Sequence, residues 1–242
     1  MQKLSFKVDG YNLAGTIFYP DKPKEKNSAI FFVHGWTGNM KNSFQYAEAL
    51  SKLGFVCMLF DMRGHGESEG DIKKFTIKEF SNDVLAAYDH LVGVDLVDSE
   101  NISVIGSSFG GYLISILSTK KKIRNLVLRA PADYPNEDFH KSKYLFSGSE
   151  NPEIVAWRKL VKKPADTFAL QAINNYRGDV LVIESEKDII VPHESTQNYI
   201  DAIKDKNKLT HVVINDAPHS IKEGIFRNKV TNILIDWFRN KI

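Results

Sequence analysis

The sequence has a single cysteine, Cys57, which excludes a disulfide within the chain. It lies in the apolar run GFVCMLFD, which favours a buried and unreactive thiol. No apolar run approaches the roughly 20 residues that a membrane-spanning helix needs. The first residues, MQKLSFKVDGYN, lack the apolar centre of a secretory signal. We therefore expect a cytoplasmic protein that has no membrane span and is made without a cleavable signal.

The chain also lacks a charge of one dominant sign. Its 32 Lys and Arg residues against 30 Asp and Glu residues give a net charge of +2, so there is no electrostatic reason to expect nucleic acid or an anionic membrane as a partner. A composition of 43% hydrophobic and 26% charged residues is ordinary for a soluble globular protein. A chain of 242 residues is long enough for one large α/β domain.

The apolar pattern predicts a mostly parallel sheet of about eight strands. Residues 3–19 alternate strictly in KLSFKV and become extended again in NLAGTIFY after a turn, which predicts an antiparallel hairpin. Short, continuously apolar runs then alternate with helical segments; they are AIFFV, FVCMLF, ISVIG, NLVLRA, DVLVIES and THVVIN. Continuous apolarity indicates strands that are covered on both faces, as in parallel sheets flanked by helices. We predict a single α/β domain over residues 1–242.

Two of the flanking helices have clear sequence signals. Thr76 and Glu79 have the spacing of a capping box, apolar residues with helical spacing follow, and Gly93 is the expected end of that helix. A last helix, over residues 225–238, is expected to cover the sheet.

Residues 131–176 interrupt the alternation of strands and helices. This stretch of 46 residues contains four prolines and no clear strand pattern. A connection of that length is usually functional or disordered. Its seven aromatic residues argue against disorder. We interpret the segment as an inserted cap of helices and loops.

The candidate nucleophile lies where a strand passes into a helix, in NISVIGSSFGGYLISIL. Residues 106–110 (GSSFG) fit G-x-S-x-G with Ser108 at the central position. A serine in this setting is typical of a nucleophile elbow, whose small neighbours let strand and helix close around it. The alternative is a tight turn with a serine that does no chemistry.

A serine hydroxyl becomes a useful nucleophile when a base takes its proton and a carboxylate orients that base. Asp188 follows the strand DVLVIES, and His219 follows the last strand, just before the final helix. The chain order Ser108, Asp188, His219 is the order expected for this arrangement. Each residue follows the carboxyl end of a strand, where open α/β sheets form their sites. These three residues are the predicted catalytic triad.

Other residues compete for the roles of base and acid. His193 is expected to open a helix and His211 to lie inside a strand, so both are weaker candidates for the base. The remaining candidates are His90, His140, Glu184, Glu186 and Asp216. We favour Asp188 as the acid because the D-x-x-V-P turn places it furthest into the loop after its strand.

The segment FFVHGWTGN is the expected source of the oxyanion hole. Its turn, residues 34–38, directly follows a strand. A backbone N–H from this turn, that of Trp36, is expected to join the N–H of Phe109, the residue after the nucleophile. The alternative is that H-G-x-x-G is simply a favourable turn sequence.

These motifs together resemble those of the α/β-hydrolase superfamily, and within it the cap-bearing serine hydrolases. This group includes cinnamoyl (feruloyl) esterases, monoacylglycerol lipases and the proteins labelled serine aminopeptidases. The matching segments are HGWTG (residues 34–38), DMRGHGES (61–68), the elbow at 106–110, Asp188 and PH (218–219). The resemblance implies that residues 63–68 form a structural loop beside the site, so Asp61, His65 and Glu67 are not expected to bind a metal.

The resemblance and the triad together predict hydrolysis of small to medium carboxylic esters through an acyl-enzyme, with neither a metal nor an organic cofactor. The same residues would serve a thioesterase, a peptidase or an acyltransferase, and the fold also hosts ligand-binding proteins that are not enzymes. Charged stretches in the expected cap favour compact or aromatic acyl groups over long chains. The residues expected to contact the small-molecule substrate are Trp36, Tyr134, Phe139, Tyr144 and Trp157.

Overall fold

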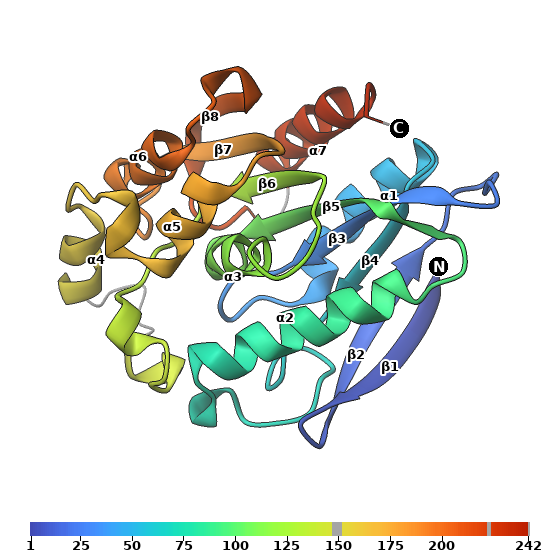
Figure 1. Cartoon of the computed structure of the whole chain (residues 1–242), viewed down its shortest axis with the longest axis horizontal. Coiled ribbons are helices and arrows are strands. Elements are labelled where there is room, and N and C mark those ends of the chain that lie inside the picture. Colours follow the sequence, from blue (N-terminus) through green and yellow to red (C-terminus); the bar gives the residue numbers. More distant parts are fainter. Residues whose placement is uncertain (147–151, 222–223, 242) are drawn as a thin grey trace.

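One sheet of eight strands runs through the protein, in the order β1-β2-β4-β3-β5-β6-β7-β8 (Figure 1). The computed structural model describes residues 1–146, 152–221 and 224–241. The strands are β1 (Gln2–Val8), β2 (Tyr11–Phe18), β3 (Asn27–Val33), β4 (Val56–Phe60), β5 (Val97–Ser107), β6 (Asn125–Arg129), β7 (Asp179–Lys187) and β8 (Leu209–Pro218). β1 and β2 form an antiparallel hairpin, β2 is antiparallel to β4, and all later pairs are parallel. The predicted mostly parallel sheet of about eight strands is confirmed.

Helices cover both faces of this sheet. The helices are α1 (Phe44–Lys52), α2 (Ile77–Val92), α3 (Phe109–Leu117), α4 (Pro152–Arg158), α5 (Phe168–Asn175), α6 (His193–Ala202) and α7 (Ile225–Phe238). α1 and α7 contribute to one apolar core, and α2, α3, α5 and α6 contribute to the other (Figure 1). No helix in the described part of the chain combines the length and the apolar character needed to cross a membrane.

The continuous apolarity of the strands follows from these two cores. Successive side chains of a strand point to opposite faces of the sheet. Phe31 of β3 packs into the core under α2 and α3, whereas its neighbours Ile30 and Phe32 pack into the core under α1 and α7. A strand covered on both faces therefore needs an apolar residue at almost every position.

The start of α2 shows how a local signal sets an element boundary. The Thr76 hydroxyl accepts a hydrogen bond from the Glu79 N–H at 3.2 Å, and the Glu79 carboxylate accepts one from the Thr76 N–H at 2.8 Å. This is the predicted capping box. The helix ends at Val92, one residue before Gly93, as the sequence predicts.

Residues 131–176 connect β6 to β7, and their described part contains short helices and no strand. Besides α4 and α5 they include the 3₁₀ turns η3 (Asn136–Asp138), η4 (Lys143–Phe146) and η5 (Pro164–Asp166). Leu170 and Ile173 of α5 pack into the same core as α3 and α6, so α5 belongs to the helix layer of the sheet. Residues 147–151 of the expected cap lie outside the described residues. That the segment acts as a cap stays a prediction.

A buried ion pair fixes the connection after β4 to α2. The Arg63 side chain is 1% exposed and that of Asp83 is fully buried, with Nη2 and Oδ1 2.6 Å apart. Nε of Arg63 donates to the same oxygen at 2.8 Å, and the Arg63 N–H donates to Oδ2 at 2.9 Å. Burial raises the pKa of Asp83 to about 6, although the bonds from Arg63 favour its ionised form.

We predict that Asp83→Asn lowers the free energy of unfolding by about 3 kcal/mol, because it leaves the buried Arg63 charge without its main partner. Urea denaturation measures this change. The matched control is Asp89→Asn on the same helix, where the carboxylate is 49% exposed and pairs with Lys121 at the surface. An equal loss of stability in both variants would contradict the role given to the buried pair.

Candidate active site

Ser108 stands alone between the end of β5 and the start of α3, in a strained backbone conformation. Its φ of 53° and ψ of −115° lie in a region that residues other than glycine rarely adopt. Its N–H donates to the carbonyl of Arg129 at 2.9 Å, and its carbonyl accepts from Tyr112 and Ala132 at 3.2 and 3.1 Å. The backbone on both sides of Ser108 is therefore held by neighbouring elements.

The glycines of the motif allow strand and helix to approach each other closely. A Cβ atom added at Gly106 would lie 2.5 Å from the carbonyl oxygen of Gly110, and one added at Gly110 would overlap the carbonyl oxygen of Val33. Contacts this short do not occur for real Cβ atoms, so both positions require glycine. Ser108 thus projects from a corner that larger neighbours would open.

A chain of hydrogen bonds joins Ser108, His219 and Asp188. The Ser108 hydroxyl lies 3.1 Å from Nε2 of His219, and Nδ1 of His219 lies 2.6 Å from Oδ2 of Asp188. The N–H groups of Ile190 and Val191 donate to the other carboxylate oxygen at 2.9 and 2.8 Å. With Nδ1 protonated, Nε2 is free to accept the serine proton. The structure brings together the three residues that the sequence analysis selected.

The competing acids and histidines bind one another or lie at other places. Glu184 lies 2.6 Å from Nδ1 of His193 and 2.9 Å from Nε2 of His211, so these three side chains form a separate cluster. Glu186 accepts a hydrogen bond from the N–H of Asp216 at 2.8 Å. Neither acid contacts His219 among the interactions of the described residues.

Arg129, at the end of β6, holds the loop that carries His219. Its Nη2 donates to the carbonyl of His219, to that of Pro218 at 3.4 Å and to the hydroxyl of Ser185 at 3.2 Å. Burial lowers the pKa of Arg129, while the nearby Asp188 favours its charged form. The sequence analysis missed this residue, although a basic residue at the end of the apolar strand NLVLRA was a usable signal.

The turn after β3 packs directly against the elbow. A Cβ atom at Gly35 would lie 3.3 Å from Cβ of Ser108, so a larger residue there would require the turn and the elbow to shift slightly apart. His34 is buried; its Nε2 accepts from the Met62 N–H at 3.1 Å, and its Nδ1 lies 2.8 Å from the Gly35 carbonyl. Burial lowers the pKa of His34 to about 4, so the ring is neutral and serves as a link between loops.

The two residues predicted to form the oxyanion hole lie on segments that meet at the elbow. The ring centroids of Trp36 and Phe109 are 5.8 Å apart, and the two rings meet edge to face. Their backbone amides belong to the turn after β3 and to the first residue of α3. The role of these amides stays a prediction.

The segment 61–68 supports this turn. The two carboxylate oxygens of Asp61 accept hydrogen bonds from the N–H groups of Met40 at 2.6 Å and Glu67 at 2.8 Å. The His65 ring packs edge-on against Trp36, with the ring centroids 5.3 Å apart. Burial lowers the pKa of His65 to about 4. No group of three or more potential metal ligands occurs among the described residues.

An open groove of about 560 Å³ contains Ser108 and His219. Its other walls come from the turn after β3, from the segment leading into α1, and from the start of α7. Trp36, predicted as a substrate contact, lines this groove. The four predicted substrate contacts of the expected cap do not; they are Tyr134, Phe139, Tyr144 and Trp157.

These four aromatic residues differ in their surroundings. Tyr134 is 2% exposed and packs edge-on against Phe109 and Tyr112, so it belongs to the core. Phe139 and Trp157 are partly buried against that core, and Tyr144 is 47% exposed. A substrate contact from any of them stays a prediction.

Residues 28–168, more than half of the chain, match the family model described as the alpha/beta hydrolase fold. The chain therefore belongs to the α/β-hydrolase fold family, which confirms the resemblance found in its motifs. Est1E from Butyrivibrio proteoclasticus, solved with ferulic acid bound, is similar in structure with a TM-score of 0.77, 19% sequence identity and coverage of 98% of both chains.

Two proteins are similar to this chain in sequence. An uncharacterized protein of Mycobacterium tuberculosis is 25% identical over 216 residues, which are 89% of this chain and 70% of that protein. The human protein named palmitoyl-protein thioesterase ABHD10, mitochondrial, is 35% identical over 95 residues, which are 38% of this chain and 29% of that protein.

Proposed function

We propose that the protein is a serine hydrolase that cleaves small to medium carboxylic esters through an acyl-enzyme. The observation that supports this most strongly is the hydrogen-bonded chain from Asp188 through His219 to Ser108, at the floor of an open groove. Membership of the α/β-hydrolase fold family supports a hydrolytic activity at the coarser level.

In the proposed reaction, the Ser108 oxygen attacks the carbonyl carbon of the ester while its proton moves to Nε2 of His219. Asp188 stabilises the imidazolium that forms and keeps the ring oriented. His219 then protonates the leaving alcohol, and a covalent acyl-serine remains. Water attacks this ester in the same way, with His219 as base, and releases the acid.

The negative charge of each tetrahedral intermediate requires N–H donors near the carbonyl oxygen. The backbone amides of Trp36 and Phe109 are the proposed donors, because their segments meet beside Ser108. A preorganised donor of this kind typically contributes about 3 kcal/mol to transition-state stabilisation. The strained backbone of Ser108 supports this arrangement, since it presents the hydroxyl and the following N–H at one corner.

A thioesterase is the second candidate. The human protein that is similar over 95 residues is named a palmitoyl-protein thioesterase, and the match covers 38% of this chain. The same nucleophile, base and oxyanion donors would act on a thioester, and the thiolate leaves more readily than an alkoxide. A peptidase or acyltransferase would also use the same residues.

Ser108→Ala is expected to abolish hydrolysis of a neutral ester such as 4-nitrophenyl butyrate, because no other side chain is hydrogen-bonded to Nε2 of His219 among the described residues. Ser107→Ala is expected to retain most of the activity. Ser107 lines both the groove and the cavity on the α1 and α7 side of the sheet, but its hydroxyl makes no hydrogen bond to His219 among the described residues. Initial rates with the two variants decide between the serines, and the opposite pattern would show that the elbow is assigned wrongly.

Asp188→Asn is expected to lower kcat by up to about 10⁴-fold, because an amide favours the wrong tautomer of the histidine. Steady-state kinetics measure this loss, and circular dichroism checks that the fold persists. The matched control is Asp216→Asn near the end of the neighbouring strand β8. Asp216 has a φ of 61°, which asparagine tolerates, so the control should fold and remain active. If Asp216→Asn lost activity while Asp188→Asn kept it, Asp216 would be the acid of the triad.

Specificity constants are expected to peak at short acyl chains of about two to six carbons or at phenylpropenoyl groups, for esters and thioesters alike. Each buried CH₂ contributes about 0.8 kcal/mol only where an apolar wall receives it, and the groove at Ser108 is lined mostly by polar side chains and glycines. Matched oxygen and thiol esters of increasing length provide the measurement. A steady rise up to palmitoyl thioesters would favour the thioesterase and reject the short-chain preference.

A further inference from the structure

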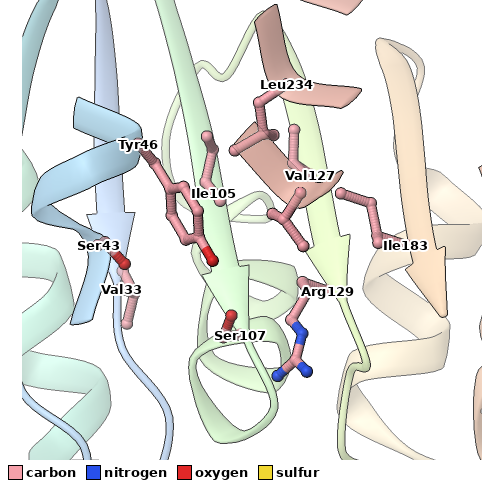
Figure 2. A pocket seen from close by; sticks show the side chains of 10 residues that line it. Val33, Ser43, Tyr46, Ile105, Ser107, Val127, Arg129, Ile183 and Leu234 are labelled. Atoms are coloured by element: carbon pink, nitrogen blue, oxygen red, sulfur yellow. The ribbon is translucent and has the colours of Figure 1, made fainter. Parts of the chain in front are cut away.

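A narrow cavity between the sheet and helices α1 and α7 shares lining residues with the groove at Ser108 (Figure 2). The inner part of this cavity is apolar and is lined by Val33, Ile105, Val127, Ile183, Val230 and Leu234. Tyr46 and Arg129 line both the cavity and the groove. Figure 2 shows the Arg129 guanidinium beyond the apolar side chains, past the carboxyl ends of the strands, and the Tyr46 hydroxyl pointing in the same direction.

The walls of the groove carry positive charge. Lys41, Arg129 and Arg227 line it, and no aspartate or glutamate is among its lining residues in the described part of the chain. Two of these three charges are balanced nearby. Lys41 pairs with Glu67 at 2.8 Å, and Arg129 lies close enough to Asp188 for the carboxylate to favour its charged form.

Arg227 is the remaining cation. It lies in the first turn of α7, and its Nε is buried with no hydrogen-bond partner among the described residues. Because Nε has almost no exposed surface, a ligand in the groove is expected to meet the other N–H donors of this guanidinium, whose charge has no acidic partner among the described residues. This cation is separate from the triad.

Tyr46 supports the same place from α1. Tyr46 and Arg227 both line the groove. Burial raises the pKa of Tyr46, although the charges of Arg129 and Arg227 oppose this, so the phenol keeps its proton. The protonated hydroxyl therefore has an O–H to donate to an acceptor in the groove.

We propose that the groove selects esters whose acyl or alcohol part carries a carboxylate, bound by Arg227 and the Tyr46 hydroxyl. Arg227 is the one groove-lining cation without an acidic partner among the described residues, and a single positive charge matches a carboxylate better than a phosphate dianion. A guanidinium and a carboxylate form short, charge-assisted hydrogen bonds. The proposal rests on the proposed function, because Ser108 and His219 define the reacting end of the groove.

The test compares esters that differ only in one charge. For the acyl side, 4-nitrophenyl hydrogen adipate and suberate are paired with their methyl-capped diesters. For the alcohol side, the butyrate ester of 4-hydroxybenzoate is paired with that of methyl 4-hydroxybenzoate. The pair with the larger ratio of anionic to neutral kcat/KM identifies which part of the substrate lies against Arg227.

For at least one pair, the wild-type protein is expected to prefer the anionic ester by roughly tenfold, which corresponds to about 1.4 kcal/mol. Arg227→Gln is expected to bring this ratio close to one, and Arg227→Lys to restore part of it. The matched control is Arg239→Gln, just after the same helix, where the side chain is 63% exposed and pairs with Asp236. This control is expected to keep the wild-type ratio.

Three results would overturn the proposal. The first is Ser108-dependent hydrolysis with no preference for any anionic ester, which would leave the proposed function intact. The second is an equal fall of the ratio in Arg239→Gln, which would indicate a general charge effect. The third is a ratio that Arg227→Gln leaves unchanged.

A binding measurement separates this proposal from the proposed function. If the wild-type protein hydrolyses no ester, the proposed function fails, but calorimetry with Ser108→Ala still compares monomethyl suberate with dimethyl suberate. Tighter binding of the monoanion, lost in the double variant with Arg227→Gln, would support the carboxylate site. Equal binding of the two compounds, or binding of neither, would reject it.

Discussion

The strained backbone at Ser108 is the constraint on which the rest of the site depends. A non-glycine residue with positive φ costs about 1–3 kcal/mol and persists only where its surroundings enforce it. Here the bare backbones of Gly106 and Gly110 let β5, α3 and the end of β3 meet at one corner. The hydrogen bond from the Ser108 N–H to Arg129 ties β6 to the same corner. The sheet thus places the serine relative to every loop that approaches it.

Two arginine side chains hold the loops around this corner. Arg63 joins the connection after β4 to Asp83 of α2, and that connection carries the Asp61 and His65 contacts that support the turn after β3. Arg129 does the same for the loop that bears His219. Side chains with several donors suit this task because one residue can satisfy several carbonyl or carboxylate oxygens that the loops leave without partners.

Much of the fold was predictable because its signals are local. A strand covered on both faces must be apolar at successive positions, and the capping box of Thr76 and Glu79 lies within one helical turn. The proximity of Ser108, Asp188 and His219 was predictable because each residue follows a strand, and parallel strands end at one edge. The full groove was not predictable, because its lining combines the turn after β3 with Tyr46 of α1 and Arg227 of α7, which are far apart in the sequence. The aromatic residues of 131–176 predict a substrate wall from composition alone, and composition does not reveal that Tyr134 is buried against Phe109.

Two of the groups that line the groove, His219 and Arg227, come from neighbouring positions in the sequence. His219 and Arg227 both lie in the segment that leads from β8 into the first turn of α7. The proposed base and the proposed carboxylate-binding cation are therefore close neighbours in the sequence. Substitutions in this one segment would bear on both the proposed catalysis and the proposed choice of substrate charge. Residues 131–176 hold neither group, because they leave the sheet after β6.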